Sequence, residues 1–216
     1  MKAGLKRGKN NPDRSAEQRL FARGYRRLAG LDEAGRGALA GPVVAAAVIL
    51  PENITFPWME DVKDSKLLSA RQRNILFSGM LDSGIEIGLG IIAPAVIDTV
   101  NILNATRQAM QAALEQITEP PDFVLTDAVC LPRLRTPQQN IIRGDRTCLC
   151  IACASIAAKV TRDRIMCEMH AEYPHYGFKA HKGYGTSQHL LMLQEHGACA
   201  IHRFTFSPVR ALEMLL

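Results

Sequence analysis

The sequence lacks any apolar run long enough to cross a membrane. A bilayer-spanning helix needs roughly 18 consecutive apolar residues, whereas the run from Val43 to Leu50 has eight and indicates a buried strand. The basic N-terminus is not followed by the apolar segment of a secretory signal. We therefore expect a cytoplasmic protein with no membrane partner.

The sequence also lacks a second cysteine pair. Cys150 and Cys153 have C-x-x-C spacing and Cys148 precedes them, but the six cysteines form no other such pair, and the nearest histidine is His170. A structural zinc site usually takes four ligands from two pairs. Because the neighbouring residues are small and apolar, we expect buried free thiols that pack as small hydrophobic side chains.

Charge is unevenly distributed along the chain, although the net charge is only +5. Residues 1–27 contain nine basic residues (Lys or Arg) and two acidic residues (Asp or Glu). Residues 28–130 contain six basic and thirteen acidic residues, and residues 131–216 contain eleven basic and six acidic residues. An acidic segment followed by a basic one suits a metal site beside a surface that binds a polyanion. Ordinary surface charge fits the same counts.

The length of 216 residues, with 47% hydrophobic and 22% charged residues, predicts one globular domain. Residues 1–18 are polar and aperiodic, so we expect a flexible basic tail there and a single domain over residues 19–216. Strands are predicted at 28–33, 42–50, 85–92 and 122–126, and helices at 69–82, from 94, at 102–118, at 145–172, at 186–196 and near the C-terminus. An α/β fold follows, with an antiparallel meander extended into a mixed sheet if the fourth strand joins through a helical crossover.

Four acidic residues occur where strands end or a helix begins. Asp32 and Glu33 close the first strand, Asp127 follows the fourth, and Asp145 precedes the long helix. Taken singly, each could cap an element or lie in a solvated loop. Together they are natural oxygen ligands for Mg²⁺ or Mn²⁺. Two such ions about 4 Å apart can activate water and stabilise the leaving oxygen in phosphodiester cleavage.

The stretch Gly30-Leu-Asp-Glu-Ala-Gly-Arg-Gly37, followed by Leu39-Ala-Gly-Pro-Val43, resembles the signature of type 2 ribonucleases H, the ribonuclease HII family. The resemblance continues through Asp64-Ser-Lys66, Asn101-Ile-Leu-Asn104, Asp127, Gly144-Asp145, Ala154-Ser-Ile-Ala-Ala-Lys-Val-Thr-Arg-Asp163, Tyr176-Gly-Phe178, His181-Lys-Gly-Tyr-Gly-Thr186 and His202-Arg203. The blocks span almost the whole chain after the tail, and their order and spacing make a chance match implausible.

This resemblance implies a ribonuclease H-like fold: a central mixed sheet flanked by helices, with a helical C-terminal extension. It implies endonucleolytic cleavage of RNA in RNA–DNA hybrids, and cleavage on the 5′ side of a ribonucleotide embedded in duplex DNA, leaving a 3′-hydroxyl and a 5′-phosphate. Asp32, Glu33, Asp127 and Asp145 are the implied catalytic residues and metal ligands. The implied cofactors are two Mg²⁺ or Mn²⁺ ions, and a monomer is expected.

The resemblance also implies substrate contacts. The Gly35-Arg36-Gly37 turn is expected to contact the 2′-hydroxyl, the group that distinguishes RNA from DNA, and Tyr184 to stack on the sugar at an RNA–DNA junction. Lys66 is expected to contact a phosphate. Ser155 and Lys159 are expected either to contact phosphate and support the site or to serve only in packing.

Several positions depart from the family pattern or leave a choice open. Leu67 replaces a second lysine, so affinity for the backbone is expected to be weaker or to come from elsewhere, such as the tail. Ala128 stands where glycine is common. The histidines His175, His181 and His202 are expected in loop or capping roles rather than as general acids.

Two other functions remain open from the sequence. A hybrid-binding module could keep the scaffold without the chemistry, although the presence of all four acids argues against it. Another metal nuclease of the same fold, such as a resolvase or a type 3 ribonuclease H, would share the acids. Contact with a sliding clamp is left open, since the C-terminal residues predict only a short apolar helix.

Overall fold

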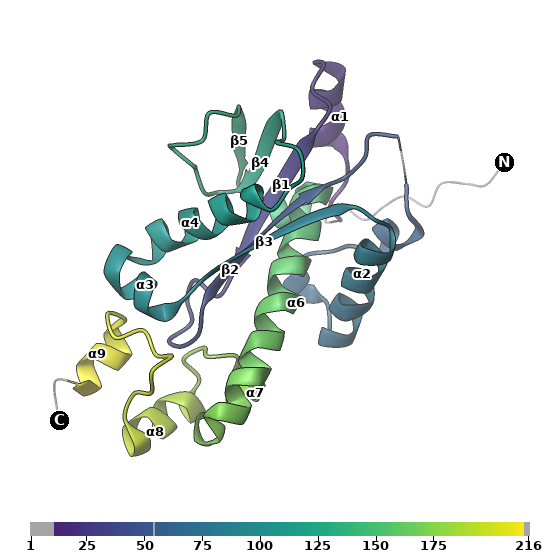
Figure 1. Ribbon diagram of the computed structural model, residues 1–216. Coiled ribbons are helices and arrows are strands. Elements are labelled where there is room, and N and C mark those ends of the chain that lie inside the picture. The colour runs from purple at the N-terminus through teal and green to yellow at the C-terminus, as the bar shows by residue number, and fades with distance from the viewer. Residues whose placement is uncertain (1–10, 54, 214–216) are drawn as a thin grey trace.

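The structure is a computed structural model that describes residues 11–53 and 55–213 (Figure 1). Its centre is a five-stranded sheet with the strand order β3-β2-β1-β4-β5. β1 pairs antiparallel with β2 and β2 antiparallel with β3, whereas β4 lies parallel to β1 and β5 parallel to β4. The strands are β1 (Leu28–Ala34), β2 (Val43–Ile49), β3 (Glu86–Ile92), β4 (Phe123–Asp127) and β5 (Gln138–Ile141). The expected meander and mixed sheet are confirmed.

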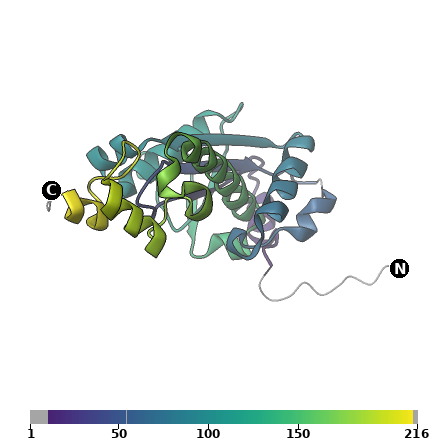
Figure 2. The same cartoon turned by 90° about the horizontal axis from the view of Figure 1, so that it is seen from below.

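Helices cover both faces of the sheet, as Figure 2 shows from below. On one face, α6 (Leu149–Glu172) and α2 (Ala70–Asp82) pack against Leu28, Ala46 and Val48. On the other face, α4 (Ile102–Glu115), preceded by α3 (Pro94–Val100), packs against alternate residues of the same strands. β2 is buried along its whole length because both of its faces are covered.

α2 illustrates why the sequence forms these helices. Ser69 accepts a hydrogen bond from the Gln72 N–H, and the Gln72 side chain accepts one from the Ser69 N–H, so the helix begins with a capping box. Two short 3-10 segments, η1 (Pro57–Asp61) and η2 (Ser65–Leu67), connect β2 to this helix. No helix within residues 11–53 and 55–213 is long and apolar enough to span a membrane.

The expected helical C-terminal extension is confirmed. It contains η3 (Pro174–Tyr176), α7 (Phe178–His181), α8 (Ser187–His196) and α9 (Ser207–Glu213). Its own hydrophobic cluster is centred on Phe178 and Leu193 and includes Met166 of α6. Leu39 and Ala40, from the turn after β1, belong to the same cluster. The extension therefore packs on the segment that follows the first two acidic residues.

One local prediction was wrong, and one strand was not predicted. The expected tail at residues 1–18 includes residues 15–18, which form the start of helix α1 (Ser15–Ala22); residues 1–10 lie outside the described part of the chain. α1 is anchored because Leu20 and Phe21 are buried and Glu17 accepts the Cys150 N–H at 2.9 Å. β5 was not predicted, because its sequence, Gln-Gln-Asn-Ile, has no apolar alternation. It forms by pairing at the sheet edge.

Gly30 on β1 sets how closely α6 approaches the sheet. A Cβ at this position would lie 2.3 Å from the carbonyl carbon of Cys150. We predict that Gly30→Ala lowers the free energy of unfolding by about 3 kcal/mol, because the clash is with backbone and cannot be relieved by a side-chain rotation. Urea unfolding measures this, with Gly37→Ala as the control, since a Cβ at Gly37 meets nothing within 4 Å. Equal unfolding midpoints for the two variants would contradict the packing described.

Candidate active site

Parallel pairing of β1 and β4 brings the predicted acids to one edge of the sheet. Leu31 pairs with Thr126, so the next residues, Asp32 and Asp127, are neighbours. Glu33 follows on β1, which continues one residue further to Ala34. Asp145 lies in the short helix α5 (Gly144–Thr147), and the Gly144 N–H donates to Asp127 Oδ1 at 2.9 Å. Three adjacent elements thus carry the four acids.

The acids are close enough to affect one another's ionisation. Burial, together with the negative charges of Glu33 and Asp127, raises the pKa of Asp32 well above its usual range. Burial also raises the pKa of Glu33, although the Arg36 guanidinium 3.2 Å from Glu33 Oε1 opposes the shift. Burial and the charge of Asp145 raise the pKa of Asp127. The folded chain therefore concentrates negative charge that it does not fully neutralise.

Lys66 is a second cation beside this group, in addition to Arg36. Its Nζ lies 3.6 Å from Asp145 Oδ2. Burial disfavours its charge, but attraction to Asp145, Asp64 and Asp32 outweighs burial and raises the pKa of Lys66. Its backbone N–H is held by Asp64 Oδ1 at 2.9 Å. The ammonium group is thus placed by η2 at the rim of the acidic site.

The donor set fits a hard divalent cation. Asp32 and Asp145 are only 6% and 4% exposed, and carboxylate oxygens are the ligands that Mg²⁺ and Mn²⁺ prefer. Glu33 Oε2 is buried and has no hydrogen-bond donor among the described residues. A buried carboxylate oxygen without a donor is costly. A bound cation would satisfy it and reduce the repulsion among the acids.

The cysteines form a different kind of cluster. Donor atoms of Glu17, Cys148 and Cys150 lie within 4.8 Å of one another, and this is the only three-ligand group of that kind in the described part of the chain. Burial raises the pKa of Cys150 and Cys153 well above the usual range, so both remain thiols. All three cysteines are free and buried, which confirms the expected packing role.

Two buried arginines hold the turn that follows β1. Arg162 of α6 donates to the carbonyls of Pro42 at 2.9 Å, Ala40 at 3.0 Å and Lys182 at 2.8 Å. Arg203 donates to the carbonyl of Gly41 at 2.9 and 3.0 Å and to that of Arg36 at 2.9 Å. Both side chains are 0% exposed. Burial lowers the pKa of both, that of Arg203 to about 9 with the charge of Arg162 adding to the effect.

These contacts orient the Gly35-Arg36-Gly37 backbone. Gly35 has φ 95°, and a Cβ there would lie 2.0 Å from Arg162 Nε, so the buried arginine requires glycine at this position. The Arg36 carbonyl points inward to Arg203. Since the described chain has no cis peptide bond, and a trans peptide directs its C=O and N–H oppositely, the Gly37 N–H points outward. Arg36 and Gly37 are both exposed.

Tyr184 is positioned by Arg162, one of the two buried arginines. Its ring centre lies 5.4 Å from Arg162 Cζ and 5.7 Å from Lys159 Nζ, and the residue is 37% exposed. The neighbouring Gly183 carbonyl accepts the Leu39 N–H at 2.8 Å. The structure therefore brings the loop of Tyr184 against the glycine-rich turn, although the two are far apart in sequence.

Histidine side chains support the loop that contains Tyr184. His189 Nε2 lies 3.0 Å from His202 Nε2, and His189 Nδ1 lies 3.0 Å from the Tyr184 carbonyl. Burial and the neighbouring His189 lower the pKa of His202 to about 4. His181 bonds the Tyr176 carbonyl and accepts the Gly183 N–H. For His181 and His202, the supporting role expected from the sequence is the one the geometry favours.

Ser155 and Lys159 take different positions on α6. Ser155 is buried, its hydroxyl lies 3.0 Å from that of Ser65, and it hydrogen-bonds Asp32. This makes Ser155 a support for the acid rather than a surface contact. Lys159 pairs with Asp163 at 2.7 Å and stays partly exposed near Tyr184.

The two departures from the family pattern have visible consequences. Leu67 is 70% exposed, so the usual second lysine would face solvent beside Lys66. Ala128 has φ 56°, in the left-handed region that favours glycine, which explains why glycine is common there. Neither change removes an acid from the site.

Sequence reasoning missed the role of the two buried arginines. Both occur in blocks that resemble the family, as the Arg of Thr-Arg-Asp163 and of His202-Arg203. A charged residue in a sequence is normally predicted to be exposed. No neighbouring residue in the sequence indicates that backbone carbonyls are the partners of these two arginines. His189 was also not singled out.

Comparison with known proteins gives a consistent result. A family model described as Ribonuclease HII matches residues 29–209. Ribonuclease HII of Ruminiclostridium cellulolyticum is 51% identical over 192 residues, covering 89% of this chain and 74% of that protein. Ribonuclease HII of Dehalococcoides mccartyi is 45% identical over 201 residues, covering 93% and 95%.

Solved structures show the same architecture. Ribonuclease H2 from Pyrococcus horikoshii superposes with a TM-score of 0.75 at 26% identity, covering 88% of this chain and 98% of that one. Bst-RNase HIII in complex with Mn²⁺ superposes with a TM-score of 0.63 at 14% identity, covering 88% and 70%. The expected ribonuclease H-like fold is confirmed.

Repulsion among the acids predicts that removing one negative charge stabilises the metal-free protein and weakens metal binding. Asp127→Asn removes a charge without changing size, and its Oδ1 can still accept the Gly144 N–H. We expect the metal-free melting temperature to rise by about 2–4 °C, the effect of ~1 kcal/mol in a domain of this size. The stabilisation that Mg²⁺ gives the wild type should shrink. Thermal unfolding with and without Mg²⁺ measures both; Asp61→Asn, at an exposed position, should change neither. A lower metal-free melting temperature for Asp127→Asn would contradict the repulsion.

The three hydrogen bonds of the buried Arg162 guanidinium predict that a positive charge alone cannot replace arginine at this position. Arg162→Lys keeps the charge but cannot reach three carbonyls from one planar group. We expect a loss of about 3 kcal/mol in the free energy of unfolding, because buried carbonyls and a buried ammonium are left poorly paired. Urea unfolding tests this against Arg71→Lys, at an exposed position of α2. Equal stability of the two variants would show that the three bonds contribute little.

Proposed function

This chain belongs to the ribonuclease HII family, and we propose that it cuts duplex DNA on the 5′ side of a single embedded ribonucleotide, as well as cutting continuous hybrids. Membership makes it a nuclease of the ribonuclease H type, a hydrolase that acts on RNA–DNA. The observation that carries the finer proposal is the placement of four repelling acids beside an outward-pointing backbone N–H. Products with a 3′-hydroxyl and a 5′-phosphate are part of the proposal.

Asp32, Glu33 and Asp127 would hold two divalent ions, Mg²⁺ or Mn²⁺, and Asp145 would complete or organise the site. The ions, when bound, would supply charge neutralisation at phosphorus and activation of the attacking water. The family's dependence on divalent metal and the donorless Glu33 Oε2 support this assignment. Lys66 would hold a phosphate oxygen at the rim, since its side chain is 75% exposed while it pairs with Asp145.

Recognition of the ribose would come from the turn and from Tyr184. The Gly37 N–H faces outward because the Arg36 carbonyl is held inward by Arg203. A 2′-hydroxyl can accept such a hydrogen bond, and deoxyribose cannot. The exposed Tyr184 ring, held against Arg162, offers an apolar face for the neighbouring sugar. Arg162 and Arg203 both donate to the turn at residues 36–42, so the turn and Tyr184 would keep a fixed relative position.

Cleavage of a duplex with one ribonucleotide tests the proposal. We expect the wild type to cut it on the 5′ side of the ribonucleotide with Mg²⁺ and not without divalent metal. Asp32→Asn should lose at least about 10³-fold in turnover, the scale for removing a group that stabilises transition-state charge, while duplex affinity persists. Asp61→Asn is the control.

The alternatives predict different outcomes of that assay. A hybrid-binding module would bind the duplex and cut neither it nor a continuous hybrid. A nuclease that needs a longer run of ribonucleotides would cut only the continuous hybrid. Unchanged turnover in Asp32→Asn would remove that residue from the mechanism. Monomeric state and cytoplasmic location stay predictions.

A further inference from the structure

A hollow lined mainly by basic side chains lies beside the acidic site. It has a volume of about 690 Å³ and runs between α2 and α6, reaching the start of the extension. Four positively charged side chains line it, against the two acids Asp163 and Glu168. The basic residues are Arg73, Lys159, Arg164 and Lys182. The lining is therefore net positive, which suits an anionic ligand.

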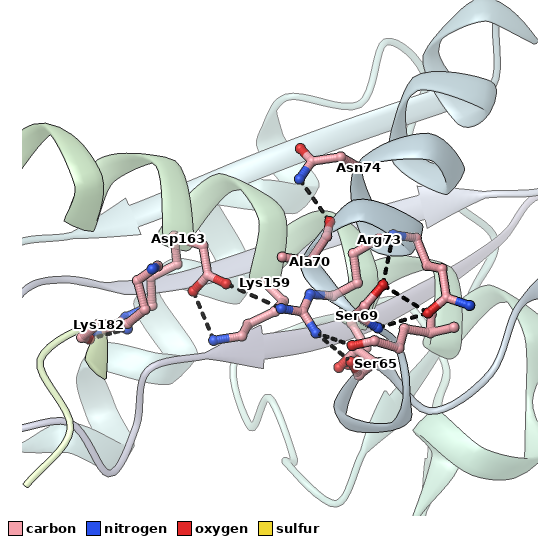
Figure 3. A network of polar contacts seen from close by, with 12 residues as sticks. Ser65, Ser69, Ala70, Arg73, Asn74, Lys159, Asp163 and Lys182 are labelled. Carbon is pink, nitrogen blue, oxygen red and sulfur yellow. Dashed lines mark hydrogen bonds and ion pairs between the residues drawn. The ribbon is translucent and has the colours of Figure 1, made fainter. Parts of the chain in front are cut away.

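Asp163 organises one half of this groove. It pairs with Lys159 at 2.7 Å and with Arg73 at 3.5 Å, and Arg73 also donates to the Ser65 carbonyl at 2.9 Å (Figure 3). Asp163 is thus balanced by two cations, and its charge does not cancel the remaining two. The chain of contacts leads back to Ser65, whose hydroxyl meets Ser155 below Asp32.

Arg164 and Lys182 form the other half. Arg164 is exposed, donates to Asn74 Oδ1 at 3.1 Å and lies 5.4 Å from the Phe77 ring centre. These contacts orient the guanidinium but use few of its five N–H donors. Lys182 donates through Nζ to the Lys179 carbonyl, and its own carbonyl is fixed by Arg162. Both cations meet neutral acceptors there.

The groove continues the acidic site along one side of α6. Ser155, Lys159 and Asp163 are four residues apart, so they lie on one face of the helix. At 1.5 Å per residue, Asp163 is about 12 Å along the axis from Ser155. This corresponds to three or four base pairs at ~3.4 Å per step. A duplex cut at the acids would pass its backbone phosphates over this groove.

We propose that the groove lined by Arg73, Lys159, Arg164 and Lys182 binds backbone phosphates of the substrate duplex a few nucleotides from the cut. This rests on the proposed function. Arg164 and Lys182 make the direct phosphate contacts. Arg73 and Lys159 form the base of the groove, where both pair with Asp163. Such contacts add affinity without reading sequence. They also compensate for the lysine missing at Leu67.

Duplex binding without divalent metal tests the groove separately from cleavage. We compare the wild type, Arg164→Gln/Lys182→Gln and the control Arg107→Gln/Arg133→Gln, which removes two charges from a hollow on α4 at the opposite face of the sheet. The groove variant should bind a duplex containing one ribonucleotide about tenfold more weakly at ~0.15 M salt. Its plot of log affinity against log salt should be shallower by about 1.8, or 0.9 per lost contact.

Single neutral methylphosphonate linkages, moved along each strand, identify the phosphates. We expect the wild type to lose affinity at one to three positions three or four steps from the ribonucleotide, and the groove variant to be insensitive there. Arg164→Gln alone, at an exposed helix position, should give half the change in salt slope. It also guards against misfolding of the double variant.

The outcomes separate the two proposals. Equal affinity and salt slope in the groove variant and the control would overturn the groove while leaving the proposed function intact. Sensitivity to methylphosphonates that persists unchanged in the groove variant would also overturn it. A wild type that binds duplex and shows the groove effect, but never cuts, would support the groove and overturn the proposed function. A wild type that binds no duplex without metal would overturn the groove, and the cleavage assay with Mg²⁺ would then decide the proposed function.

Discussion

The architecture depends on two buried guanidinium groups that form no salt bridge within the described part of the chain. Removing a charge from water is expensive, and it is tolerated only when every donor finds an acceptor. In both Arg162 and Arg203, each of the three guanidinium nitrogens donates to a backbone carbonyl, either in the turn at residues 36–42 or at Lys182. Because carbonyls are consumed on the inner side, the amide of Gly37 is left on the outer side. An internal hydrogen-bonding requirement thus determines which backbone group the turn presents to solvent.

The same arginines join three separate parts of the chain. Arg162 comes from the central helix α6 and Arg203 from the extension, and each donates to different carbonyls of the turn after β1. The acids are placed by the sheet and α5, and the Gly35–Gly37 turn and Tyr184 by the arginines. The positions of these two groups are therefore set by different interactions: strand pairing for the acids, and contacts of buried arginines for the turn and Tyr184. α6 belongs to both, since Ser155 bonds Asp32 and Arg162 bonds the turn.

Much of this could be predicted from the sequence, and the reasons differ by element. The apolar run of β2 and the Ser69 cap of α2 are local signals, and both gave correct elements. The family motifs identified the acids, which the fold then brought to one edge. β5 has no local signal because only pairing with β4 makes it a strand. Glu17, Arg162 and Arg203 are charged residues buried by distant backbone groups, and a sequence does not display which carbonyls will receive them.

The bond between Arg203 and the carbonyl of Arg36 spans 167 positions of the chain. During synthesis at ~5–20 residues per second, about 10–30 s separate the emergence of the first acids from that of Arg203. Asp32 and Glu33 are made early, and the turn beside them lacks its inner anchor until the chain is nearly complete. A growing polypeptide on the ribosome therefore carries these two acids without the hydrogen bond that fixes the neighbouring turn. The order of the sequence delays the final conformation of this turn until translation is almost over.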